Sequence, residues 1–156
     1  MRTTCAALAI FFVLTGTCAC GSVVKDSSTR DEAVAKYGTR TFDAPLDKVV
    51  EAAVGALKSQ GYEIALASAE KGVVKTGRKI VQGLYAGGQH GGQAVWASRQ
   101  YTLSFRMEGA ACRVSASPQY FVGEQDYTAK RYWDGEGPDG EVTLWNNLFN
   151  EMATLL

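Results

Sequence analysis

Two consecutive stretches of the chain alternate apolar and polar side chains with the period of a half-buried β-strand, and a turn at residues 108–110 joins them. The apolar side of the first stretch carries Tyr101, Leu103, Phe105 and Met107, and that of the second carries Cys112, Val114 and Ala116. We therefore predict a β-hairpin, which Pro118 ends or marks as an edge. A sheet with one apolar face must bury that face against another layer, so the rest of the chain has to supply a cover.

Two segments have the apolar spacing of amphipathic helices and can supply that cover. The first carries Leu46, Val49, Val50, Ala53 and Leu57 on one face, and the second carries Leu144, Trp145, Leu148, Phe149, Met152 and Leu156. Pro45 is expected at the first position of the first helix, and Gly61 follows its end. Asp139 is expected to cap the second helix, with Glu141 in the first turn.

Residues 39–42, 62–67 and 73–76 are further strand candidates, the last two forming a second hairpin around a turn at residues 70–72. The element order is then β-α-β-β-β-β-α. It predicts an α+β domain of two layers, in which an antiparallel sheet of about four to six strands is covered on one face by two helices. We expect one domain, which spans residues 38–156.

Residues 1–19 resemble a bacterial lipoprotein signal peptide. Arg2 gives a charged start, a short apolar run follows, and small residues precede Cys20. The apolar run is about ten residues, whereas a transmembrane helix needs roughly 20. The resemblance implies that Cys20 is acylated and becomes the new N-terminus, with residues 20–37 as lipid anchor and flexible spacer.

The residue after the lipidated cysteine bears on localisation. Gly21, rather than an aspartate, resembles lipoproteins that are passed to the outer membrane, so we expect a lipid-anchored protein facing the periplasm. Two alternatives remain open. An ordinary signal cleaved after Ala19 would leave the protein periplasmic or secreted, and Cys18 could be the acylated residue in place of Cys20.

The charge and cysteine content of the chain limit which partners and metal sites can be expected. The chain has 16 basic and 16 acidic residues, so nucleic acid and acidic membrane surfaces are not expected as main partners, because both require basic patches. Cys112 is expected to be a buried free thiol if Cys20 is acylated, and a Cys20–Cys112 disulfide is conceivable if it is not. Neither cysteine is placed to bind zinc.

Residues 77–98 are rich in glycine and contain His90, the one histidine of the chain. The phosphate-binding glycine patterns are absent from this segment, and we interpret it as a hairpin tip or spacer around Gly83–Gly92. An apolar loop that contacts a partner or a membrane surface is the alternative. We interpret His90 as a solvated loop residue, since no ligand or orienting group lies at suitable spacing.

The acidic residues Asp134, Glu136, Asp139 and Glu141 form a cluster before the last helix. Their spacing does not match a calcium-binding loop, so we interpret them as a loop that leads into a helix cap. No general base with an orienting partner can be named, and we expect no enzyme activity, no metal and no cofactor.

Aromatic and basic residues gather between the last strand and the final helix, where tyrosine and tryptophan are typical of interfaces. The candidate partner surface consists of Tyr120, Tyr127, Lys130, Arg131, Tyr132 and Trp133.

The pattern Phe42-x-Ala44-Pro45, continued by Val49, Ala52, Ala56-Leu57, Gly61-Tyr62-x-Ile64 and Lys71-Gly72-Val73-Val74-x-Thr76, resembles the helix-grip domains of BamC, a lipoprotein of the β-barrel assembly machine. The resemblance implies that the C-terminal helix lies across the sheet, with a groove beside it. We expect a non-catalytic, membrane-tethered module for protein interaction or assembly, with an envelope protein as partner. The alternative is a carrier that binds a small apolar ligand in that groove.

Overall fold

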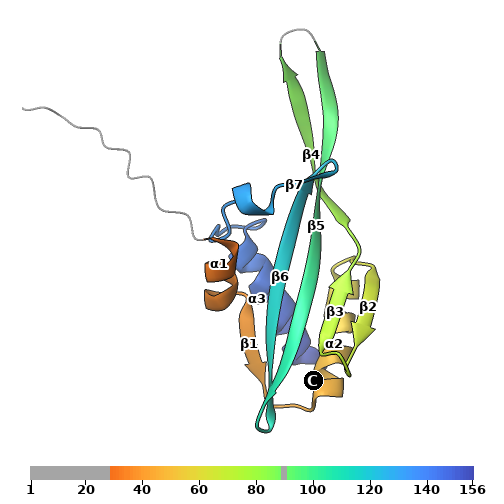
Figure 1. Cartoon of the computed structure of the whole chain (residues 1–156), viewed down its shortest axis with the longest axis vertical. Helices are drawn as coiled ribbons and strands as arrows, with labels where there is room; N and C mark the ends of the chain where they lie inside the picture. Colours follow the sequence, from red (N-terminus) through yellow and green to blue (C-terminus); the bar gives the residue numbers. More distant parts are fainter. Residues whose placement is uncertain (1–28, 89–90) are drawn as a thin grey trace, which may run out of the picture.

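The sheet is built around its two longest strands, β5 (Gly91–Glu108) and β6 (Ala111–Val122), as Figure 1 shows. In the computed structural model, which describes residues 29–88 and 91–156, they pair antiparallel from Ala97↔Val122 to Glu108↔Ala111. Gly109 closes the turn between them with a φ of 67°, a value that favours glycine. The predicted signal peptide, Cys20 and His90 lie outside the described residues. The hairpin predicted from the alternating pattern is thus confirmed.

The remaining strands extend this pair on both sides to give a seven-stranded antiparallel sheet. Its main order is β1–β6–β5–β3–β2, with β4 paired to β5 and β7 paired to β6. The additional strands are β1 (Thr39–Phe42), β2 (Ile64–Ser68), β3 (Val73–Thr76), β4 (Lys79–Gly88) and β7 (Gln125–Asp126).

Helices α2 (Leu46–Ser59) and α3 (Glu141–Leu155) lie together on one face of the sheet. Between them and the sheet lies the core, which includes Leu57, Leu103, Trp145 and Phe149. The protein therefore has the predicted α+β class and two-layer arrangement. A short 3₁₀ turn, η1 (Thr128–Lys130), comes before the loop that leads into α3.

The N-terminus of α3 differs from the prediction that Asp139 caps it. The N-cap is Gly140, and it makes no side-chain hydrogen bond. A Cβ on Gly140 would lie 2.3 Å from the carbonyl oxygen of Gly135, and that same oxygen accepts a hydrogen bond from the Val142 N–H. A backbone carbonyl of the preceding loop therefore takes the place of the expected side-chain cap.

A third helix, α1 (Arg30–Lys36), corrects the predicted domain boundary at residue 38. Thr29 and Glu32 form a reciprocal capping box at its start, and Ala33 and Val34 are buried where α1 contacts β6 and β1. The hydroxyl of Thr39 donates to the Val34 carbonyl over 2.9 Å. The packed domain therefore includes residues 29–37, which were predicted to be part of a flexible spacer.

The glycine-rich segment at residues 77–98 is mostly strand rather than loop, which raises the strand count above the predicted four to six. β4 and the first part of β5 pair from Lys79↔Arg99 to Gly88↔Gly91. In the part of β5 that precedes Ala97, β5 pairs only with β4. The two strands there form a two-stranded ribbon that projects from the body (Figure 1). The ring of Trp96 lies against Gly83, where a Cβ would be 2.9 Å away, so a glycine is needed opposite this tryptophan.

The packing of α1 predicts that substitutions at neighbouring positions change the stability of the protein by different amounts. Val34→Ala should lower the free energy of unfolding by about 1–2 kcal/mol, because it removes two buried methyl groups. Ala35→Ser, at the exposed neighbouring position, should change it by less than about 0.5 kcal/mol. Urea unfolding of both variants tests this, and equal effects would mean that α1 is not packed on the domain.

Candidate functional site

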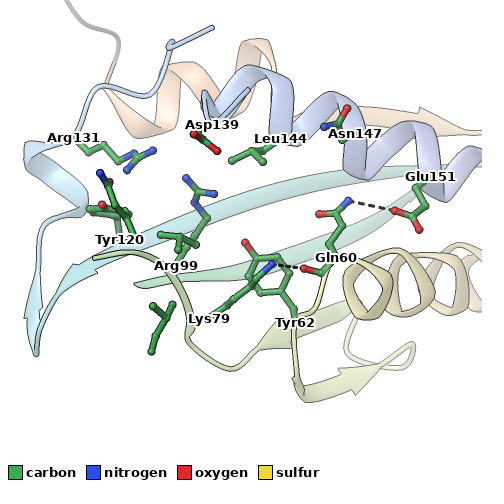
Figure 2. A pocket seen from close by; sticks show the side chains of 13 residues that line it. Gln60, Tyr62, Lys79, Arg99, Tyr120, Arg131, Asp139, Leu144, Asn147 and Glu151 are labelled. Carbon is green, nitrogen blue, oxygen red and sulfur yellow. Dashed lines mark hydrogen bonds between the residues drawn. The ribbon is translucent and has the colours of Figure 1, made fainter. Parts of the chain in front are cut away.

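A cavity of about 700 Å³ lies beside α3, between that helix, the end of α2 and the base of the β4–β5 ribbon. Figure 2 shows the side chains that line it. Its charged lining residues are Lys79, Arg99, Arg131, Asp139 and Glu151, and its apolar and aromatic ones are Tyr62, Ile80, Val81, Tyr120 and Leu144. This mixture of cations with apolar side chains distinguishes the cavity from the rest of the core.

Arg99, one of the residues that line the cavity, belongs to a buried ion pair. Arg99 lies on the core-facing side of β5, and its Nη2 is 3.2 Å from Oε2 of Glu141, the first residue of α3. Both side chains are almost fully buried, with 6% and 0% of their surface exposed. The hydroxyl of Tyr101, also on β5, donates to the other carboxylate oxygen, Oε1. These contacts attach the first turn of α3 to the centre of the sheet.

Burial determines the ionisation of this cluster. Burial raises the pKa of Glu141, although Arg99 and the Tyr101 hydroxyl act to lower it. Burial alone would lower the pKa of Arg99, but the neighbouring Glu141, Tyr101 and Tyr62 raise it by more, so its net direction is upward. The pKa of Tyr101 is well above its usual value, first because of burial and then because of Glu141. Tyr101 therefore acts as a neutral hydroxyl donor, and Arg99 remains a cation.

Two buried donors at the same end of the cavity have no partner. Among the described residues, the Nε atoms of Arg99 and Arg131 are inaccessible to solvent and have no hydrogen-bond acceptor. The Arg131 guanidinium lies over the ring of Tyr120, 4.2 Å from its centroid, and 5.4 Å from that of Trp133. In Figure 2 the guanidinium groups of Arg99 and Arg131 occupy the same region, near Asp139 and Tyr120.

The other two charged groups that line the cavity and belong to α3 and β4, Glu151 and Lys79, already have partners. Glu151 accepts hydrogen bonds from Ser59 and Gln60, and the ammonium of Lys79 donates to the carbonyl of Gln60. Lys79 also lies over the ring of Tyr62, 5.0 Å from its centroid. These contacts join α2, α3 and β4, so the charges of Glu151 and Lys79 are satisfied within the protein.

The predicted partner surface does not exist as one exposed patch. Trp133 is 1% exposed and Tyr120 is 8% exposed, so both belong to the core. The indole N–H of Trp133 donates to the Thr128 carbonyl over 2.9 Å, which fixes the ring beneath η1. Tyr132 is exposed, while Tyr127 is half-buried with Lys130 over its ring. Arg131 and Tyr120 instead line the cavity.

The acidic cluster also separates into different environments. Asp139 and Glu136 are exposed and Asp134 is half-buried, whereas Glu141 is 1% exposed and belongs to the ion pair. Within the described part of the chain, no three His, Cys, Asp or Glu side chains are placed to hold a metal ion. Cys112 is buried, as predicted from its position in the alternating pattern, and it forms no disulfide within the described residues.

The sequence itself contains a signal for the ion pair between Arg99 and Glu141. Glu141 is four residues before Trp145, and so continues the apolar stripe of its helix, while Arg99 falls between Ala97 and Tyr101 on the core side of its strand. Charged residues at core positions of two separate elements are expected to pair, because an unpaired buried charge is costly.

Comparisons with known proteins leave the family open. Neither the models of known protein families nor the curated proteins give a match. A crystal structure of a DUF4468 family protein from Bacteroides ovatus ATCC 8483 is similar, with a TM-score of 0.44 and 9% identity over 75% of this chain and 83% of that one. None of the helices in the described part of the chain is long and apolar enough to cross a membrane.

The raised pKa of Glu141 predicts a pH dependence of stability. In the folded state Glu141 keeps its proton to higher pH than in the unfolded state, so its contribution to stability is present below the unfolded pKa and is lost as the pH rises through the folded one. The unfolding free energy of the wild type minus that of Glu141→Gln should therefore fall as the pH rises above the ordinary pKa of a glutamate. Denaturant unfolding across this range measures it, with Glu136→Gln as the exposed control. A difference that rises with pH would contradict the prediction.

Proposed function

We propose that the protein is a non-catalytic, membrane-tethered assembly module whose contact element is the β4–β5 ribbon. The occupant of its open edge is a second copy of the same chain. The supporting observation is an unprotected edge strand, uncharged after its first residue, Lys79, that projects from the body of the domain.

The ribbon lacks the features that normally protect a sheet edge. Residues 80–98 contain no lysine, arginine, aspartate, glutamate or proline. Within the described residues β4 pairs with β5 alone, so its outer backbone N–H and C=O groups are free to pair with another strand. Natural edge strands are usually blocked by charges, prolines or a covering element. An edge without such protection is suited to β-strand addition.

Exposed apolar side chains on the ribbon support the same interpretation. Tyr85 is 86% exposed, Ile80 62% and Trp96 57%, and all three lie on β4 or on the part of β5 that pairs with it. Large aromatic side chains of this kind contribute strongly to interfaces when they are buried.

Charge favours a second copy as the occupant. In a two-fold antiparallel pair of β4 strands, equivalent segments face each other, and a charge near the centre would lie close to an identical charge. The uncharged strand avoids this repulsion. Anchoring both copies on one membrane would also raise their effective concentration.

A charge on the edge should separate the copies. We expect the full-length protein in a non-ionic detergent to be a dimer by light scattering and Tyr85→Lys to be a monomer, because the charge would have to be buried in the new pair. Ala67→Lys places a charge on β2, a different edge strand of the sheet, and should remain dimeric.

A dimeric Tyr85→Lys variant would contradict pairing through β4. A monomeric wild type that crosslinks in native envelopes to a different protein would replace the second copy by that partner, and a monomer without crosslinks would refute the assembly role.

The tether is the second part of the proposal. Its support is the resemblance of residues 1–19 to a lipoprotein signal, with Cys20 as the acylated residue and the outer membrane, on its periplasmic side, as the location. The relationship to the helix-grip domains of BamC is likewise proposed, and the position of α3 over the sheet with a cavity beside it supports it.

Substitution of the two neighbouring cysteines tests the tether. Cys20→Ala should abolish incorporation of labelled palmitate and move the protein from the membrane to the soluble fraction, whereas Cys18→Ala should change neither. The reverse result would assign the anchor to Cys18. If both variants behave as the wild type does, the anchor is refuted, and a periplasmic or secreted location replaces it.

A further inference from the structure

We propose that the cavity beside α3 binds a small amphipathic molecule, with a carboxylate or phosphate head at Arg99 and Arg131 and an apolar body along the remaining wall. This inference does not depend on pairing through the ribbon.

The first support is a cation that the fold buries without satisfying it. Arg99 is 5% exposed, and Glu141 lies against its Nη2 while its Nε–H has no acceptor among the described residues. A buried donor without a partner costs about 1–3 kcal/mol. Because Arg99 lines the cavity, an anionic oxygen bound there would lie against its guanidinium group and gain the added strength of a charge-assisted hydrogen bond.

The second support is Arg131, which meets the same cavity from the loop after η1. Its ring contact with Tyr120 holds the planar guanidinium in place, and its Nε–H is also buried without an acceptor. No ion-pair partner lies within 4.0 Å of it among the residues that the structure describes. Two guanidinium groups on one cavity favour a planar or tetrahedral oxyanion, which such forks bind with two hydrogen bonds.

The third support is the distribution of the other lining residues. Asp139 is exposed at the same end, where water screens its charge. Lys79 and Glu151 are already hydrogen-bonded to groups of the protein, so neither requires a partner from a ligand. Tyr62, Leu144 and the exposed Ile80 supply apolar surface in the same cavity. The volume of the cavity is typical of small-molecule sites.

Probes that share a short alkyl chain and differ in their head group test the site. Hexanoate, hexyl phosphate and hexanol are titrated calorimetrically into the full-length protein in a non-ionic detergent. We expect at least one of the two anions to bind about tenfold or more tightly than hexanol, and its affinity to fall with ionic strength. The tighter of the two anions identifies the head group. Hexanol binding as tightly as both anions, or no binding of either anion, would overturn the proposal.

Variants at Arg131 separate a specific site from general attraction. Arg131→Gln should weaken binding of the preferred anion about tenfold, and Arg131→Lys should retain part of it, because the charge remains while the fork is lost. Lys130→Gln removes the same charge from the adjacent exposed position and should bind as the wild type does. Unfolding curves confirm that each variant is folded. If Arg131→Gln and Lys130→Gln weaken binding equally, or if neither does, the site is not at Arg131.

Discussion

The ion pair between Arg99 and Glu141 is the interaction on which the two layers depend. It joins the middle of the longest strand to the first turn of α3, with Tyr101 as a third member. A buried pair of this kind gains little over an apolar pair, yet loss of one partner leaves an uncompensated charge that costs about 3–5 kcal/mol. The pair therefore acts mainly as a positional constraint. It determines where α3 begins, and hence where the wall of the cavity stands.

Much of the architecture could be predicted from side-chain periodicity. The alternation through Tyr101 and Leu103 and the helical stripe through Trp145 and Leu148 were sufficient for the class, the layers and the central hairpin. Two elements were missed for physical reasons. Glycine weakens an isolated strand, so the segment around Gly83 resembled a loop, although the ring of Trp96 covers that glycine. The polar surface of α1 concealed two small buried residues, Ala33 and Val34.

The candidate site was harder to predict than the fold. Aromatic residues near η1 indicate large apolar area, but composition alone does not say whether that area faces solvent or the core, and Trp133 proved to face the core. Glu141 was interpreted as a helix-terminal acid because the first turn of a helix commonly carries one. Its role follows from Arg99, which is 42 positions earlier in the chain and comes close to it only when the sheet and α3 pack. Local periodicity can place each residue of such a pair on a core face, but it does not show which residue is the partner.

One continuous strand, β5, serves both the ribbon and the cavity. Its first residues pair with β4, while Arg99 and Tyr101, only a few positions later, hold Glu141. Ile80 and Val81, next to the register shift in β4, border the cavity as well. The backbone of these two strands therefore connects the ribbon directly to groups at the cavity. Any free energy that couples the two places must act equally in both directions, so an occupied cavity would alter the assembly equilibrium by the same factor by which assembly alters occupancy.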